Sequence, residues 1–573
     1  MLYSNVFLPG ALAGPVAGGV GVSDLKIQAV HVPGASVSAA SYWIDILFVF
    51  AIAAGYLLVK TLRERSCVAT AVEAVAKKEA QIAHDEAPAR SPSVDSWRRG
   101  ANEVSPAAAG QCRLTFRSSA KPRQRPGRAA TEQHWKLNQQ LCAATTAEQV
   151  LQLVGESGGH MNEVNLSTAI HRIAKWSKSQ QLDVSEVRAT PQWRKLLRLI
   201  QSRLSDFTAQ GVSNTVWAIG TMRVDYKVDA EFLDAVNDVA KAKIMEFTPQ
   251  ALANTAWACA TLRMLRTDLL TEVRRACLAS VAAFNPQDLA NISWAFGSLG
   301  MLDTEFLDGV AKVALPMLGA FKPAEMSNIT WAFATAGYYK REIFDRVAQV
   351  AVENAQALNS KALANIAWSF ATLEVRNDEL MTNLLRVSAV KIRWFSPLEL
   401  ANLVWSCARC GGSSRLSLKA SSDRFLEAAA VAITRSSDRF TPDDISNAVW
   451  GFATLRYHHA GCLAHLTEAA MHMEDASPQV LSTIFWAFAT LGHKPSSLFV
   501  SLGETVAMKV SQFDVDQIAS VVWALSVTGV REPAVLEALA LAAKGQESNV
   551  ASRATLKSSF ARLSFEHEAI LQL

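Results

Sequence analysis

Apolar residues in the long carboxyl-terminal part of the chain follow a pattern that returns about every 37 residues. The stretch PQALANTAWACATLRM (249–264) is followed by PQDLANISWAFGSLGM (286–301). Both are apolar or small at nearly every position, which predicts a helix buried on all sides. The stretch between them, RTDLLTEVRRACLASVAAF (266–284), spaces its apolar residues three and four apart. It predicts an amphipathic helix in an exposed outer layer.

Tryptophan marks the period most clearly. Successive repeat tryptophans lie 36 to 40 residues apart, apart from one step of 45. Such a period is typical of stacked helical hairpins. His171 and Phe560 occupy the tryptophan position in two degenerate end units, so we expect an all-α fold, an α-solenoid of about eleven hairpins of ~37 residues over 151–573. The repeat-defining tryptophans are Trp217, Trp257, Trp294, Trp331, Trp368, Trp405, Trp450, Trp486 and Trp523.

The residues around each tryptophan predict how the first helix starts and packs. Thr248 and Asn285 stand nine residues before a tryptophan and can cap the first turn, and Pro249 and Pro286 follow at a position that needs no N–H donor. The residue four before the tryptophan is Ala or Ser, and the residue three after it is Gly, Ala or Ser. These positions share one helix face, so each indole is expected to lie between small residues where a neighbouring helix approaches closely.

Asparagine stands three residues before the tryptophan in seven units. Amides pair with base edges, so this position could read a nucleic acid. An amide that barely changes carries little sequence information, however, and an internal ladder of amides that satisfies buried backbone groups is the favoured interpretation. The seven residues are Asn214, Asn254, Asn291, Asn328, Asn365, Asn402 and Asn447.

The motif F-x-P-Q-x-L-A-N-x-x-W-A-x-A-T-L, repeated from about residue 160 to 573, resembles known helical repeats. It is similar to octotricopeptide repeats of organellar RNA factors, to FAST-kinase-like (RAP-type) proteins, and to helical-repeat subunits of the RNA-editing substrate-binding complex. The resemblance implies an RNA-binding protein of a mitochondrion or chloroplast. It implies a role in RNA processing, stability, editing or translation, with organellar transcripts and other proteins of a ribonucleoprotein complex as partners.

The amino-terminal region differs in composition from the repeats. Residues 1–41 read as a disordered leader, and 42–59 as one hydrophobic helix, either a membrane anchor or a removed targeting signal. Residues 60–150 read as a flexible linker rich in Ala, Ser, Pro and charge. Within it lies a run without acids that could be a transit-type sequence or a basic arm for RNA instead of a plain linker. Its cations are Arg113, Arg117, Lys121, Arg123, Arg125 and Arg128.

Charge and chemistry narrow the function classes. The net charge is +4, and it comes from the amino-terminal 150 residues, whereas the repeats are nearly neutral. Any RNA affinity of the repeats must therefore come from local patches, and a membrane-tethered protein scaffold is the alternative function. We find no catalytic motif, so we expect no enzyme, cofactor or metal site. Cys407 and Cys410, in C-A-R-C, align with core positions of other repeats.

The step of 45 residues indicates an insertion. It centres on GGSSRLSLKASS (411–422), between the two helices of one unit. We expect a loop on one rim of the solenoid, either a contact for a partner or a tolerated insertion.

Overall fold

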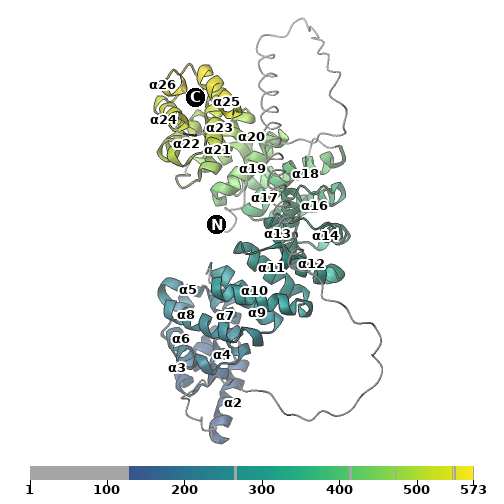
Figure 1. Cartoon of the computed structure of the whole chain (residues 1–573), viewed down its shortest axis with the longest axis vertical. Coiled ribbons are helices and arrows are strands. Elements are labelled where there is room, and N and C mark those ends of the chain that lie inside the picture. Colours follow the sequence, from purple (N-terminus) through teal and green to yellow (C-terminus); the bar gives the residue numbers. More distant parts are fainter. Residues whose placement is uncertain are drawn as a thin grey trace, which may run out of the picture. The chain divides into compact units, whose positions relative to one another are not determined.

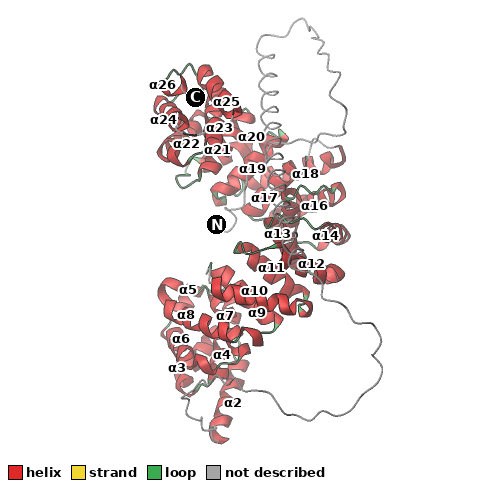
Figure 2. Cartoon of the chain, in the orientation of Figure 1, coloured by secondary structure: helices red, strands yellow, loops and turns green. Residues whose placement is uncertain are grey.

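The computed structural model describes residues 128–571, except 264–266, 412–415, 472, 545 and 547–549. Every regular element in this described part is a helix, and no strand occurs in it (Figure 2). The predicted all-α class is therefore confirmed. No helix among the described residues is long and apolar enough to cross a bilayer. The predicted leader (1–41) and hydrophobic helix (42–59) lie outside the described residues.

Eleven helical hairpins follow one another between residues 163 and 571 of the described chain (Figure 1). We call the first helix of each hairpin the A helix and the second the B helix. The A helices are α4 (Glu163–Ser179), α7 (Ala209–Met222), α9 (Pro249–Leu262), α11 (Pro286–Ser298), α13 (Pro323–Thr335), α15 (Ser360–Thr372), α17 (Pro397–Arg409), α19 (Pro442–Leu455), α21 (Pro478–Thr490), α23 (Val515–Thr528) and α25 (Val550–Arg562). The B helices are α6 (Pro191–Arg203), α8 (Tyr226–Ala242), α10 (Thr267–Ser280), α12 (Thr304–Ala314), α14 (Arg341–Glu353), α16 (Asp378–Lys391), α18 (Leu416–Thr434), α20 (Ala460–Ala470), α22 (Ser496–Lys509), α24 (Pro533–Lys544) and α26 (Glu568–Leu571).

Each hairpin packs mainly on the next one along the chain. Every A helix contacts the following A helix, from α4 on α7 to α23 on α25, and the B helices stack beside one another as a second layer. The core lies between the layers, where Phe296 and Phe306 meet edge to face with ring centroids 5.0 Å apart. This nearest-neighbour packing confirms the predicted α-solenoid.

The predicted capping residues start the A helices. The Thr248 hydroxyl accepts a hydrogen bond from the Ala251 N–H at 3.2 Å, and Pro249 takes the next position. Lys322 has no oxygen to cap α13, and there the Glu325 carboxylate accepts from the Lys322 N–H at 2.9 Å. The start of each hairpin is thus fixed by local hydrogen bonds.

The A helices end in a conformation that the repeat pattern did not predict. Six residues after each of the nine repeat tryptophans, the backbone turns left-handed. Glycine adopts this conformation without a steric penalty, whereas a residue with a Cβ atom loses about 1 kcal/mol there. The nine residues are Arg223, Arg263, Gly300, Gly337, Glu374, Gly411, Arg456, Gly492 and Gly529.

Replacing Arg456 (φ 52°) by glycine is expected to raise the free energy of unfolding by about 1 kcal/mol, because the strain is removed. The reverse change, Gly492→Ala (φ 68°), should lower it by about 1 kcal/mol, since nothing crowds that site and only the backbone conformation matters. Urea denaturation of both variants measures the two changes in the free energy of unfolding. Equal shifts in the same direction would contradict the explanation.

Helices also occupy part of the predicted linker. Helix α2 (Arg128–Ala143) lies wholly before residue 151, α3 (Ala147–Ser157) begins before it, and both pack against α4. Leu141, Val150 and Val154 are fully buried in this contact. The array therefore begins at Arg128 instead of 151, because the first hairpin needs a cover for its apolar face.

The inserted segment is mostly helix. Helix α18 begins at Leu416 and is longer than the other B helices, so it absorbs the extra residues. Leu418 is fully buried, and the Ser417 hydroxyl donates to Asp378 on α16 at 2.7 Å. The expected rim loop is thus wrong for residues 416–422, while 412–415 lie outside the described residues.

Candidate nucleic-acid interface

One face of the A helices is only partly covered. Positions seven and three before the tryptophan, the tryptophan itself, and the position four after it share this face. In α9 these residues are Gln250, Asn254, Trp257 and Thr261, of which Gln250 is exposed and the others are half-buried. We call this surface, continued along successive A helices, the A face. The expectation that the A helices are buried on all sides is wrong here, because the B helices cover only their other side.

Tryptophan rings form a row along the A face. Two are nearly buried, Trp331 at 5% and Trp368 at 6% exposed, and the other seven are half-buried. The rings of Trp405 and Trp450 lie 6.0 Å apart. The predicted packing of an indole on small residues is seen at Gly220 and Gly297. An added Cβ at either glycine would lie about 3 Å from the tryptophan ring of the next repeat. Part of each half-buried ring remains available to a ligand.

The asparagines lie beside these rings and form few internal hydrogen bonds. Asn447 Nδ2 donates to Asn402 Oδ1 across one repeat boundary at 3.5 Å, and Gln210 Nε2 donates to Asn214 Oδ1 at 2.9 Å. Among the hydrogen bonds of the described residues, none joins these seven amides to a backbone group of an adjacent helix. Of the internal ladder of amides that the sequence favoured, the described residues thus contain one amide–amide hydrogen bond, between Asn447 and Asn402. Asn365 and Asn402 are buried, whereas the other five amides are half-buried and can bind a ligand.

Exposed cations lie at the amino-terminal end of the row of A helices. Lys175 and Lys178 on α4 are exposed, and Lys178 Nζ lies 6.0 Å from the centre of the Trp257 ring. Arg223 is exposed at the end of the next A helix. None of these three forms an ion pair within the described part of the chain. Unpaired cations beside an aromatic ring suit the phosphate and base of a nucleotide.

His171 continues the aromatic row toward the amino terminus. Its ring centroid lies 4.9 Å from that of Trp217. Burial lowers the pKa of His171, and the nearby Lys175 and Arg172 lower it further. The ring is therefore neutral at pH 7 and packs as an aromatic side chain in the tryptophan position.

The other candidate residues lie elsewhere. The cations Arg113 to Arg125 of the basic run lie outside the described residues, and Arg128 is the first residue of α2. Cys407 is fully buried, and burial raises the pKa of its thiol to about 12. The thiol is thus protonated, as a core residue would be.

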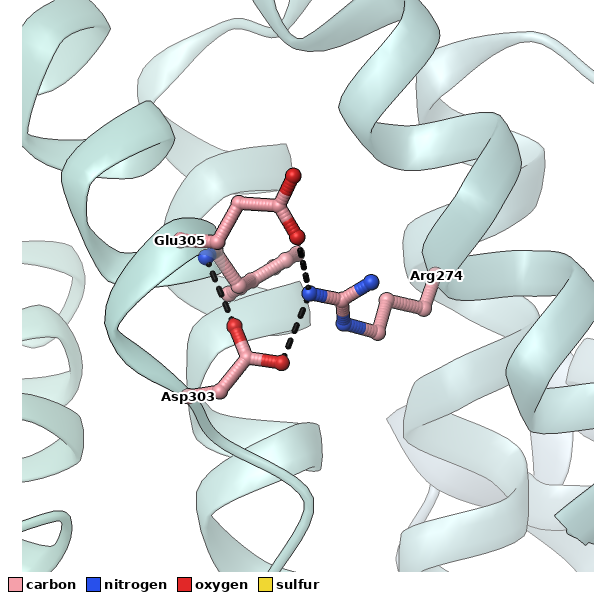
Figure 3. A network of polar contacts seen from close by, with 4 residues as sticks. Arg274, Asp303 and Glu305 are labelled. Carbon is pink, nitrogen blue, oxygen red and sulfur yellow. Dashed lines mark hydrogen bonds and ion pairs between the residues drawn. The ribbon is translucent and has the colours of Figure 1, made fainter. Parts of the chain in front are cut away.

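Outside the A face, ion pairs connect consecutive B helices. Arg274 on α10 lies between Asp303 and Glu305 at the start of α12 (Figure 3). Its Nη2 atom donates to Asp303 Oδ2 at 2.6 Å and to Glu305 Oε2 at 2.7 Å. Asp303 also accepts from the Phe306 N–H at 2.9 Å, so one carboxylate caps α12 and links it to α10. This cluster is structural.

Replacing Arg274 by glutamine is expected to lower the free energy of unfolding by about 1 kcal/mol at pH 7, since the pair is partly exposed. Burial raises the pKa of Asp303, but the bonds from Arg274 and Phe306 outweigh burial and lower it. The stabilisation is therefore complete above the ordinary carboxyl pKa of about 4 and is lost as the pH falls below that value through the lowered pKa of Asp303. Urea denaturation at pH 7 and pH 3 measures this. If Arg274→Gln lowers the free energy of unfolding as much at pH 3 as at pH 7, the predicted role of the ion pair is wrong.

Comparison with known proteins gives one family match. The family model described as RNA-editing substrate-binding complex 6 protein matches residues 335–572, the carboxyl-terminal hairpins. This supports a relationship to helical-repeat proteins of RNA editing. No curated protein matches the chain significantly.

Among solved structures, the chain is similar to one titled as a homology model of the full-length AP-3 complex in an intermediate open conformation. The identity is 11% and the TM-score 0.30, over 75% of this chain and 82% of that chain. A similarity this weak supports no conclusion about function.

Proposed function

We propose that the chain binds single-stranded RNA along the A face and acts, without catalysis, in an RNA-editing or RNA-processing complex. The observation that supports this proposal most is the coincidence of three groups on one surface. Half-buried indoles, amides that are little used internally and unpaired cations all lie there. Bases stack on aromatic side chains, amides pair with base edges, and cations neutralise phosphates.

The family match supports the biological context. The matching proteins are named for an RNA-editing substrate-binding complex, and the match covers the hairpins from α14 onward. We propose that this chain likewise works among other proteins of a ribonucleoprotein complex, and that its repeats are related to octotricopeptide-type repeats. A protein scaffold without RNA contact is the alternative, since the repeats are nearly neutral overall.

Binding of the full chain to a labelled single-stranded RNA, measured across salt concentrations, tests the proposal. We expect the logarithm of the binding constant to fall linearly with the logarithm of salt, with a slope of about −0.7 for each phosphate contacted. Double-stranded RNA of the same sequence should compete poorly, because its bases cannot reach the rings. Absence of binding at low salt would overturn the proposal and favour the scaffold.

We also propose that the protein works in a mitochondrion or chloroplast. The motif's resemblance to organellar factors and the composition of the first 150 residues support this location. Imaging of the tagged chain tests it, and cytosolic signal alone would contradict it. The amino-terminal sequence of the mature protein would distinguish a retained membrane anchor at 42–59 from a removed targeting signal.

A further inference from the structure

Charge is distributed unevenly between the two ends of the A helices. We call the turn that follows each A helix the AB edge, and the turn that precedes it the BA edge. In the nine tryptophan repeats, the positions nine to six before the tryptophan hold seven acids and two cations. The positions four to eight after it hold seven cations and two acids. The A face is therefore bordered by an acidic edge on one side and a basic edge on the other.

The helix dipole accounts for part of this difference, because it stabilises acids at the start of a helix and cations at its end. It does not explain which positions hold the cations. The left-handed position six after the tryptophan favours glycine, yet three of its four other residues are arginine, namely Arg223, Arg263 and Arg456. Arg531 lies three residues after α23 ends, beyond the last turn to which the dipole effect is confined.

Three consecutive hairpins near the carboxyl terminus each place one exposed cation on the AB edge. Arg456, Lys494 and Arg531 form no ion pair with any residue that the structure describes. Helix α19 packs on α21 and α21 on α23 (Figure 1), and packed helices lie about 8–10 Å apart. Lys494 Nζ donates to the Val527 carbonyl of α23 at 2.8 Å, so it crosses one junction and keeps two N–H donors.

We infer that the backbone of a bound single-stranded RNA follows the AB edge, and that Arg456, Lys494 and Arg531 form a second group of phosphate contacts. The inference rests on the proposed function. The cations of α4 and α7 described above, which would form the first group, lie at the same end of their A helices. Acids on the BA edge repel phosphates, so the strand places its phosphates over the cations. Its bases then lie toward the half-buried indoles of the same hairpins.

Replacing Arg456, Lys494 and Arg531 together by glutamine in the full chain tests the inference. We expect the affinity for a labelled single-stranded RNA to fall roughly 50-fold at 0.15 M salt. The salt slope should shrink by about 2, at about 0.7 for each lost phosphate contact. Titrations at several salt concentrations measure both quantities.

The matched control removes three cations from the BA edge of the same part of the array. Arg435, Arg439 and Lys544 are exposed and form no ion pair among the described residues. Their replacement by glutamine changes the net charge by the same amount. It should weaken RNA binding by less than about twofold, because only screened, long-range attraction is lost.

A single substitution separates binding from folding. Arg456→Gly is expected to make the chain more stable, because it removes the left-handed strain. It should nevertheless bind RNA about fourfold more weakly at 0.15 M salt, since one phosphate contact is lost. Wild-type affinity in this more stable variant would exclude Arg456 from the contact and overturn its part of the inference.

The possible results also separate the inference from the proposed function. Equal weakening by the two triple variants, or greater weakening by the BA-edge variant, would overturn the AB edge as the path of the backbone. Wild-type affinity and salt slope in the AB-edge variant would also overturn it and assign these cations to an acidic protein partner, while the proposed function stands. Failure of the wild-type chain to bind RNA would remove both. Melting curves verify that both triple variants are folded.

Discussion

Replacing Gly451 by valine is expected to lower the free energy of unfolding by about 3 kcal/mol. Gly451 lies where α19 packs on α17, and a Cβ atom there would lie 2.7 Å from Val404 Cγ1 and 3.0 Å from the Val404 carbonyl oxygen. The carbonyl belongs to a helix backbone and cannot rotate away, so the two helices must separate. Because hairpins are stabilised by their neighbours, the unfolding transition should also broaden or divide in two.

Chemical denaturation followed by tryptophan fluorescence measures this effect. The matched control is Gly503→Ala in the B helix α22, where an added Cβ would lie at an ordinary 3.4 Å from Val535. That variant should be neutral or more stable by up to about 1 kcal/mol, since alanine favours helix. If Gly451→Val denatures at the wild-type midpoint, the close approach of α17 and α19 is wrong.

Replacing Lys175, Lys178 and Arg223 together by glutamine is expected to weaken RNA binding by roughly 50-fold at 0.15 M salt. Three lost phosphate contacts should also reduce the salt slope by about 2, at about 0.7 per contact. The three side chains are exposed and form no ion pair in the described chain, so the fold should not change. Titration of labelled single-stranded RNA at several salt concentrations measures both quantities.

The control removes the same charge from the B layer. Lys312, Lys419 and Arg424 are exposed on α12 and α18, away from the A face. Their replacement by glutamine should change RNA affinity by less than about twofold, because only long-range, screened attraction is lost. Equal weakening by the two triple variants would mean that net charge alone, and not a site on the A helices, governs binding.

The repeat architecture was predictable because its signals are local. The capping Thr248, the following Pro249 and the small residues around Trp257 act within one hairpin or between adjacent ones, and the structure places them as expected. Helix α2 was missed because its apolar residues, such as Leu137 and Leu141, are sparse in a polar segment. Contact with α4 helps to bury them, and that contact cannot be read from the segment itself.

The A face was harder to predict. An apolar helix with a tryptophan at its centre reads as buried, and the half-exposure of Trp257 or Trp294 depends on where the B helices pack. The residue seven before the tryptophan, such as Lys361, lies near the capping residues and reads as part of the helix start. The basic run from Arg113 to Arg125 remains a prediction, because it lies outside the described residues.

Nearest-neighbour packing has a consequence for how such a protein can change over generations. Each junction between hairpins presents closely similar surfaces on its two sides, so one hairpin could be duplicated or deleted without redesign of the others. Such an event would lengthen or shorten the A face by one hairpin. Point substitutions would change the surface of a single hairpin, whereas duplications would change the number of hairpins.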